Sequence, residues 1–470
     1  MRATDIKLGD MKTFRIKDMR ISHCPNEHAL LQLEGYISET EIEKIQRLAL
    51  TEEVVQVSAV DERGIWNWYG LVYDMEIQHL LHDKYLKLVL ISQSVKMDQV
   101  KRTRSFQKEG TLIGDIIEYM CKDYDALVTI NGADIKMDGM LVQYQETDWE
   151  FLKRLASHMN QQVIVHSKCV GLVLDIGLSS KNSILADAPS MVIYRKDIQA
   201  LRHELDYELS EAEVDTIIFE SREIYDITNG IGTDKGDFFI YRVESLFRQE
   251  ELVMKYVGYR RLNFKVPLLK NKKIIGASLN GRVHAVSGSK VQVNLDVDVN
   301  NTLCGNKDFS YATVYSSNAG TGWYCMPEKG DTVRVYFPSD VEKNAYAISS
   351  VHLDVDVDTS RSNPEIKSIS NAQNKQIVFS PEGILLQNTE NMYISLNDTE
   401  GITIVSNLPI CIRSDMNVTL DAAENIIING MSQVALKQGI GATTDSTILL
   451  NEGTITVSGV EFRLVENEGV

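Results

Sequence analysis

The last quarter of the chain carries a hydrophobic repeat of eight residues. Steps of eight from Leu386 and from Asn388 give two columns of seven positions, and thirteen of these fourteen positions are aliphatic, with Asn388 the exception. Because 43% of the chain is apolar, chance gives this pattern about once in 10⁴ trials for a fixed register. The aliphatic members are Leu386, Ile394, Leu396, Ile402, Ile404, Ile410, Ile412, Val418, Leu420, Ile426, Ile428, Val434 and Leu436.

Each octad predicts one short strand with two inward side chains, because residues i and i+2 share a face of a strand. Polar, turn-prone residues lie between the strands. Seven octads make only about two turns of a single-chain helix with three faces per turn, which is a small core. Three chains wound together would close the structure at every level and leave no free sheet edge. The repeat therefore predicts a needle core shared by a homotrimer.

Two other structures remain compatible with alternating apolar positions. A β-sandwich has alternating strands, although its loops normally vary in length. A single-chain β-helix that cleaves polysaccharides also repeats, but it needs more coils than this segment supplies. The second alternative makes the chain a cell-wall or polysaccharide hydrolase.

The preceding residues divide into two regions. Residues 1–273 alternate between strand and helix patterns, with strands expected at 29–36, 54–60, 85–91, 163–165 and 172–176 and a helix at 111–124. Residues 147–150 have the capping-box form Thr-Asp-Trp-Glu, which predicts a second helix. Residues 274–352 hold short strands between turn residues, at 281–286, 290–295, 311–315, 331–337 and 344–351. Five such strands indicate a small barrel of OB type.

Residues 353–374 are acidic and polar and are expected to connect the barrel to the needle and tip, residues 375–470. Further strands are expected at 448–450, 454–457 and 462–464. The expected fold class is therefore mainly β with minor α: mixed α/β hub domains of barrel type, an OB-fold barrel, and a C-terminal intertwined trimeric β-helix.

The charge of the chain excludes some partners. The formal net charge is −18, which disfavours contact with phosphate backbones and anionic lipid surfaces, so no nucleic-acid partner is expected. The six cysteines show no CxxC pairing. The N-terminus has no apolar signal segment. We expect synthesis in the cytoplasm without a signal peptide.

Two motifs resemble a known family. Residues 143–155 (QYQETDWEFLKRL) resemble the hub signature of VgrG-like and contractile phage tail spike-hub proteins, with Glu146, Thr147, Asp148, Phe151 and Arg154 at the matching positions. Residues 323–337 (WYCMPEKGDTVRVYF) are similar to the core of the family's OB-fold, with Pro327, Gly330 and Asp331 in the turn. The order of hub, barrel and octad needle is also the family's order.

The resemblance implies a trimeric spike and hub that caps a hexameric inner-tube protein and pierces a target envelope. It implies baseplate proteins as partners, a separate PAAR-type tip protein, possible effector cargo, and assembly into an injection particle that is ejected or released on contraction. Some family members carry a lysozyme-like domain before the needle or tip histidines that bind iron. Here residues 353–375 are too few for a domain, and the last histidine is His352.

No catalytic, cofactor or metal site is expected. The glycine cluster at Gly230, Gly232 and Gly236 lacks dinucleotide-binding spacing and is expected to be a turn or loop. His79 and His82 with Asp83 are two histidines beside one acid, but His82 and Asp83 fit the turn before the strand at 85–91 better than a metal site. Alternating aspartates at 354, 356 and 358 lack the loop of a calcium site and fit a solvated linker.

Overall fold

The computed structural model describes residues 1–62, 64–80, 83–179, 184–187, 191–196, 214–248, 251–299, 301–317, 319–348, 363–438, 446–451 and 453–459. The chain is mainly β, as predicted, and it divides into two compact units, Met1–Leu353 and Asp354–Val470. The octad repeat belongs to the second unit. Each unit is described separately below.

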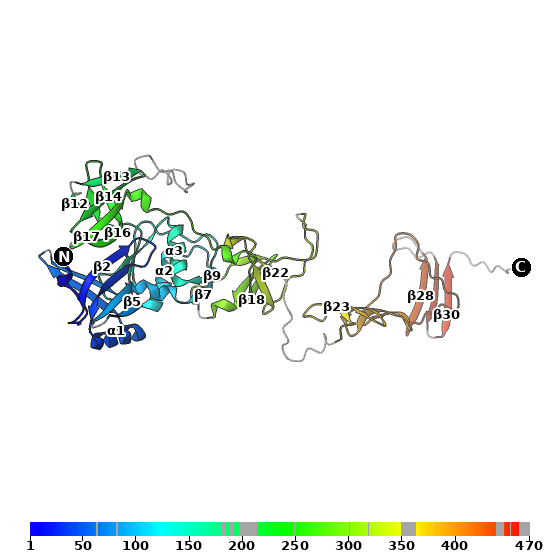
Figure 1. Cartoon of the computed structure of the whole chain (residues 1–470). Helices are drawn as coiled ribbons and strands as arrows, with labels where there is room; N and C mark the ends of the chain where they lie inside the picture. Colours follow the sequence, from blue (N-terminus) through cyan, green and yellow to red (C-terminus); the bar gives the residue numbers. More distant parts are fainter. Residues whose placement is uncertain are drawn as a thin grey trace. The chain divides into compact units, whose positions relative to one another are not determined.

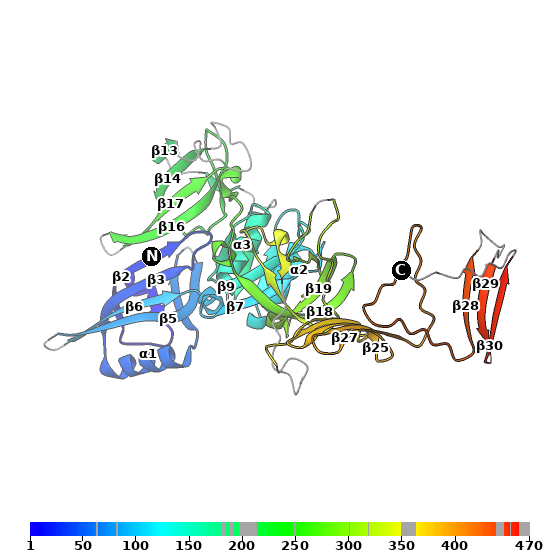
Figure 2. The same ribbon diagram turned by 90° about the vertical axis from the view of Figure 1, so that its right-hand side faces the viewer.

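A twelve-stranded sheet dominates the first unit (Figures 1 and 2). Its main path runs β1-β4-β5-β6-β3-β2-β16-β17-β14-β13, and β12 and β15 join at the side. The strands are β1 Ile6–Leu8, β2 Arg15–His23, β3 Leu30–Ile37, β4 Val55–Asp61, β5 Gly64–Leu80, β6 Asp83–Ile91, β12 Ile184–Asp187, β13 Val192–Lys196, β14 Asp215–Ser221, β15 Gly230–Gly232, β16 Phe238–Arg248 and β17 Glu251–Tyr259.

The two halves of this sheet meet at a short seam. Only His23 opposite Val243 and Ser22 opposite Glu244 pair β2 with β16. One hydrophobic core nevertheless spans both halves, from Leu31 and Leu33 to Phe238 and Tyr256. Helix α1, Glu39–Thr51, contacts β5 and buries Ile42 and Ile45 in that core. The halves therefore form one packed body despite the short seam.

A second core surrounds helices α2, Ile113–Cys121, and α3, Asp148–His158. Two small sheets contribute to it. These are the pair β7, Lys101–Phe106, with β9, Leu141–Thr147, and the trio β8, Leu127–Ile130, β10, Val163–His166, and β11, Val173–Ile176. The helix predicted at 111–124 continues beyond α2 as a 3-10 turn, Lys122–Tyr124.

Residues 278–348 form a five-stranded antiparallel sheet, the small sheet, in the order β20-β19-β18-β21-β22. Its strands are β18 Ser278–Ser287, β19 Lys290–Leu295, β20 Asp308–Ser310, β21 Thr332–Tyr336 and β22 Tyr346–Ile348. Tyr311, which follows β20, forms a single bridge to Ala347 of β22 and brings the two edges of the sheet together. Four of the five predicted strands have counterparts here, although residues 349–351 lie outside the described part.

The strand predicted at 311–315 is wrong. The strand that pairs with β19 is β20, three residues earlier. Its Phe309 lies opposite Val291 and packs with it in the core of the small sheet. Beyond Ala312, whose N–H donates to the Ala347 carbonyl at 2.8 Å, the chain leaves the sheet. Its alternating apolar residues have no strand beside them, so alternation alone misplaced the element.

The second unit contains two antiparallel meanders. The first has five strands: β23 Lys367–Ser370, β24 Gln376–Ser380, β25 Gly383–Thr389, β26 Met392–Asn397 and β27 Gly401–Ser406. The second has three: β28 Gln433–Gln438, β29 Ser446–Asn451 and β30 Thr454–Gly459. Residues 407–432, which contain three of the octads, form no strand within the chain. The octad repeat is thus paired within one chain at both ends and unpaired in the middle.

Candidate functional site

Helix α3 begins with the predicted capping box. The Thr147 hydroxyl accepts a hydrogen bond from the Glu150 N–H at 3.0 Å, and the Glu150 carboxylate accepts from the Thr147 N–H at 3.0 Å. The same hydroxyl donates to Asp98 at 2.5 Å. These contacts satisfy the N–H groups of Thr147 and Glu150 and fix the start of the helix. Trp149, which follows, is buried against His28 with ring centroids 4.5 Å apart.

Asp148 is a completely buried acid held by four side chains. Its Oδ1 accepts from Arg104 Nη2 at 2.6 Å and from Gln143 Nε2 at 2.9 Å. Its Oδ2 accepts from the Tyr124 hydroxyl at 2.6 Å and lies 3.2 Å from Arg102 Nε. Burial and the adjacent Asp148 carboxylate raise the pKa of Tyr124 above its ordinary value, so the phenol stays a donor. The charge is therefore paired on both oxygens, which a buried carboxylate requires.

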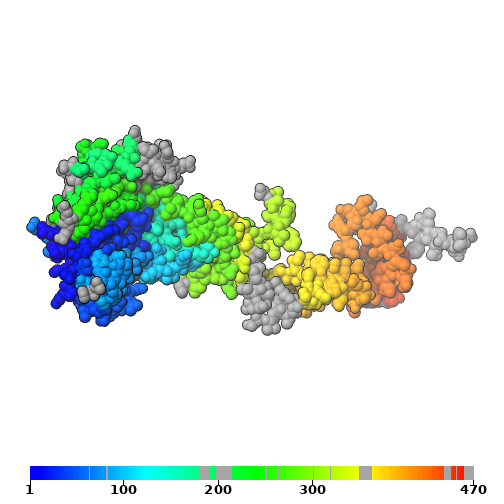
Figure 3. Space-filling view, viewed as in Figure 1, coloured from blue at the N-terminus to red at the C-terminus, as the bar shows by residue number. Residues whose placement is uncertain are grey.

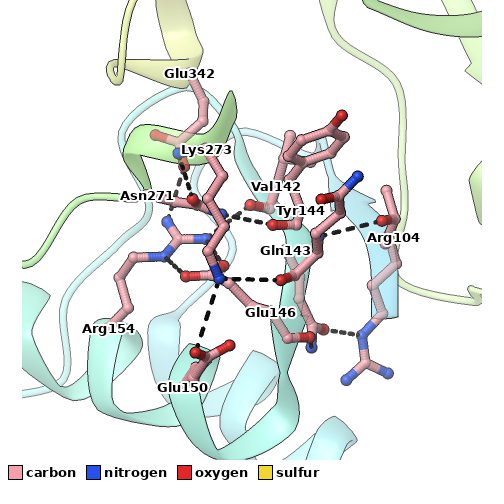
Figure 4. Close-up of polar contacts among 12 residues, drawn as sticks. Arg104, Val142, Gln143, Tyr144, Glu146, Glu150, Arg154, Asn271, Lys273 and Glu342 are labelled. Atoms are coloured by element: carbon pink, nitrogen blue, oxygen red, sulfur yellow. Dashed lines mark hydrogen bonds and ion pairs between the residues drawn. The ribbon is translucent and has the colours of Figure 1, made fainter. Parts of the chain in front are cut away.

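Arg154, on the same helix, joins two regions of the chain (Figure 4). Its Nε and Nη2 bind both oxygens of Glu146 at 3.0 and 2.8 Å. Its Nη1 binds Glu342, beside the small sheet, at 2.8 Å, and Nη2 also donates to the Val142 carbonyl at 2.7 Å. The guanidinium lies 4.8 Å from the Phe151 ring centroid. All three charged side chains are buried, so this is a desolvated triad rather than a surface pair.

A second buried contact joins β7 to the small sheet. The Asp298 carboxylate accepts from the Ser105 N–H at 2.6 Å and from its hydroxyl at 2.5 Å. The Asn301 amide donates back to the Ser105 carbonyl at 2.6 Å. Burial raises the pKa of Asp298, although the hydrogen bonds from Ser105 oppose that shift. Met140, directly before β9, and Val142, on β9, also lie in the core of the small sheet.

These buried ion pairs and hydrogen bonds form a junction that holds the β7–β9 pair and the small sheet together. Arg154 and Asp298 fasten opposite sides of the β7–β9 pair to the small sheet, and the exposed pair Lys343–Asp138 adds a contact of 2.6 Å. Glu342, Arg104 and Asp298 were missed by sequence reasoning, because isolated charged residues carry no pattern. The motif residues Pro327, Gly330 and Asp331 lie elsewhere in the small sheet. The Glu328 N–H binds the Asp331 carboxylate at 2.8 Å, and Gly330 turns with φ +98 before β21.

The predicted needle residues lie in two aligned rows on one face of the first meander. Cross-strand pairing places Ile369, Ile377, Leu386, Ile394 and Ile404 in one row. The second row contains Phe379, Ile384, Leu396 and Ile402. The three-stranded meander repeats the arrangement with the rows Val434–Leu450–Ile455 and Leu436–Ile448–Val457. In the first meander these side chains are between 36% and 74% exposed, so each chain presents an uncovered apolar face.

The remaining octad residues are Ile410, Ile412, Val418, Leu420, Ile426 and Ile428. They lie in the unpaired segment 407–432, and all are exposed. Their side chains contact no core within the chain. The first and last octads therefore lie in paired strands, whereas the octads of segment 407–432 lie in backbone that pairs with no strand of the chain.

The weaker chemical motifs of the sequence form no site in the described residues. Gly230–Gly232 is the short strand β15, paired with β12 and β16, which corrects the expected turn; Gly236 does lie in a turn, with φ +100. His79 and Asp83 lie on the strands β5 and β6, whereas His82 and the aspartates at 354, 356 and 358 lie outside the described part. Among described residues, no group of three metal-ligating side chains occurs. None of the described helices is long and apolar enough to cross a membrane.

Comparison with solved structures shows which proteins share this fold. The chain is similar to the E. coli c3393 protein, described as a component of the type VI secretion system with structural similarity to T4 bacteriophage tail proteins gp27 and gp5; identity is 11%, the TM-score is 0.54, and 74% of this chain and 99% of that chain are covered. It is also similar to a Francisella PdpA–VgrG complex, with 10% identity, TM-score 0.55 and coverage of 85% and 87%. A lidless PdpA–VgrG complex gives 9%, 0.54, 84% and 94%.

No protein-family model matches the sequence, and no curated protein matches it. The likeness at 9–11% identity is therefore one of fold. The chain has the fold of VgrG-like hub proteins, as the two sequence motifs predicted.

Proposed function

We propose that the chain is the trimeric central spike and hub of a contractile injection system, capping the inner tube and puncturing the target envelope. The observation that carries this proposal is the uncovered apolar face of the second unit. Nine aliphatic or aromatic side chains in two straight rows are too many for a face that meets only water. Three copies would bury these rows against one another.

The proposal also gives a role to the unpaired segment 407–432. A strand that pairs only with strands of other copies has no partner in one chain, so its backbone stays unpaired there. The two meanders at its ends are paired within the chain and can form first. We infer a needle whose middle part is interwound and whose ends are stacked meanders. Pulling one chain out would break ladder hydrogen bonds and apolar contacts together.

The buried junction fits the mechanical role of the first unit. Contraction loads the connection between the part that meets the tube and the part that leads to the needle. The Arg154 triad and the Ser105–Asp298 contact resist separation of these parts without an exposed, salt-sensitive bond. We propose that residues 278–348 act as an OB-type barrel in this connection. Partners would be a hexameric tube protein, baseplate proteins, a PAAR-type tip protein and effector cargo, and the spike itself would be non-enzymatic.

Native mass tests the proposal directly. Three copies of a 53.0 kDa chain give about 159 kDa, and that assembly should resist mild SDS. Ile394→Asp places three charges at one level of the needle and should abolish the trimer. Ser395→Asp, on the opposite face of β26, is the matched control and should leave it intact. A monomer that cleaves saccharides would overturn the spike in favour of a hydrolase.

A further inference from the structure

An arm, described at residues 312–317 and 319–325, stands out from the small sheet (Figures 1 and 3). The Trp323 N–H donates to the Tyr315 carbonyl at 2.9 Å, and the Ser317 N–H donates to the Thr321 carbonyl at 2.9 Å. The Tyr324 hydroxyl donates to the Gly288 carbonyl at 2.9 Å and ties the arm to the β18–β19 turn. The arm therefore has a defined shape before it meets any partner.

Its surface is apolar and uncharged. Four large side chains are exposed: Val314 at 91%, Tyr315 at 58%, Trp323 at 59% and Tyr324 at 74%. From Phe309 to Pro327 the sequence holds no charged residue, although a chain with 24% charged residues would place about five in such a stretch. Exposed tryptophan and tyrosine in a charge-poor patch are typical of a protein interface.

The occupant that best fits this surface is another copy of the same chain. Each copy carries a net charge of −18, so copies repel one another at long range, and the uncharged arm is a surface through which they can touch without bringing like charges together. The connection from β22 to β23 spans residues 349–366, which reach at most about 60 Å when fully extended. Copies joined through their needles therefore hold their small sheets close together, at high effective concentration.

We propose that the arm docks on the neighbouring copy and locks the spike above its needle. This inference rests on the proposed trimer. In a ring of three copies, one arm on each neighbour closes the assembly without a free contact. The arm thus adds a second, independent contact between copies to the one that the octads make.

Trp323 itself provides the test. The chain has four tryptophans, and Trp66, Trp68 and Trp149 are buried, so Trp323 is the exposed one. Acrylamide quenching, with Trp323→Phe used to subtract the buried residues, should be several-fold weaker in the trimer than in the monomeric Ile394→Asp variant. Trp323→Ser with Tyr324→Ser should accelerate dissociation of the trimer at least tenfold. Ile65→Ser, at an equally exposed apolar residue of β5, should not.

The outcomes separate the two proposals. A trimer in which Trp323 is quenched as readily as in the monomer overturns the docking of the arm and leaves the spike standing. If Trp323 becomes protected from quenching only when a tube or baseplate protein is added, the arm binds that protein and the proposed contact with a second copy is wrong. A chain that stays monomeric overturns both.

Discussion

Arg154 neutralises two carboxylates that come from different regions of the chain. Glu146 is the penultimate residue of β9, whereas Glu342 begins a 3-10 turn, Glu342–Asn344, beside the small sheet. Both acids are buried, so each depends on the guanidinium to stabilise its charge. The fork geometry matters as well, because a lysine cannot bind two carboxylates in this planar arrangement.

Arg154→Met should therefore lower the free energy of unfolding of the first unit by ~3–5 kcal/mol, since two buried charges lose their partner. The shift of the urea midpoint, followed by tryptophan fluorescence, to which the buried Trp149 of the same helix contributes, measures it. Lys343→Met is the matched control, because the Lys343–Asp138 pair joins the same regions but is exposed to water, so its loss should shift the urea midpoint far less. Equal effects of the two variants would contradict the role of the triad.

His23 makes the seam of the large sheet sensitive to acid. Its Nε2 is buried with no hydrogen-bond partner among the described residues, next to a cavity of about 30 Å³ lined by Trp66 and Trp68. Burial, and to a lesser extent His166, lowers the pKa of His23 to about 3. The unfolded chain, with a histidine pKa of about 6.5, binds this proton while the folded chain does not. Stability contributed by the neutral side chain is thus lost as the pH falls from about 6.5 towards 3.

His23→Gln keeps the approximate volume and removes the titration. Between pH 7.5 and 5 the wild type should lose about 2 kcal/mol more stability than the variant, since each pH unit below 6.5 costs about 1.4 kcal/mol per proton. Urea midpoints of both proteins at the two pH values provide the comparison. Parallel pH profiles would show that His23 reaches water in the folded state.

At the scale of elements, the segment 407–432 differs from its flanks. It holds octad residues at the same spacing as β25 and β26, yet it forms no strand in one chain. Its backbone amides should exchange with solvent at nearly unfolded rates in the monomeric Ile394→Asp variant. In the trimer they should be protected at least a hundredfold, because strands from other copies then satisfy them. Amides of β3, in the core of the large sheet, should be protected equally in both proteins.

The sequence predicted those elements whose determining residues lie close together along the chain. Helix α3 was predicted because its cap lies within four residues, Thr147 to Glu150, and the strands of the octads because their spacing repeats. Their antiparallel pairing into meanders within one chain was not predicted, because the spacing alone does not say which strand pairs with which. The seam between β2 and β16 was not predicted, because it joins residues such as Ser22 and Glu244 that no local pattern relates.

The residues of the buried junction also fall into a group that the sequence predicted and a group that it missed. Glu146, Thr147, Asp148 and Arg154 were singled out by their motif, and the structure places them together on or before α3. The partner Asp298 was missed because it lies 193 positions from Ser105, and only the tertiary fold brings the two together. Sequence reasoning thus found the half of the junction that is contiguous and missed the half that is distant.

At the scale of the whole molecule, net charge opposes the assembly that the apolar faces favour. Each copy carries −18, so three copies together carry about −54, and their approach is repulsive at long range. Salt screens this repulsion: the Debye length falls from about 30 Å at 0.01 M to about 8 Å at 0.15 M. The side chains of the apolar rows and of the arm are uncharged, so contacts made through them in the proposed trimer would not be weakened by screening.

Trimer assembly should therefore speed up with salt. Chain refolded from denaturant should form the 159 kDa species roughly tenfold faster in 0.15 M than in 0.01 M sodium chloride, because screening removes the barrier to approach. Size-exclusion chromatography at timed intervals measures the rate, and Ser395→Asp, with one more negative charge per copy, should show a steeper dependence. An assembly rate that falls with salt would mean that attractive ion pairs, rather than apolar faces, bring the copies together.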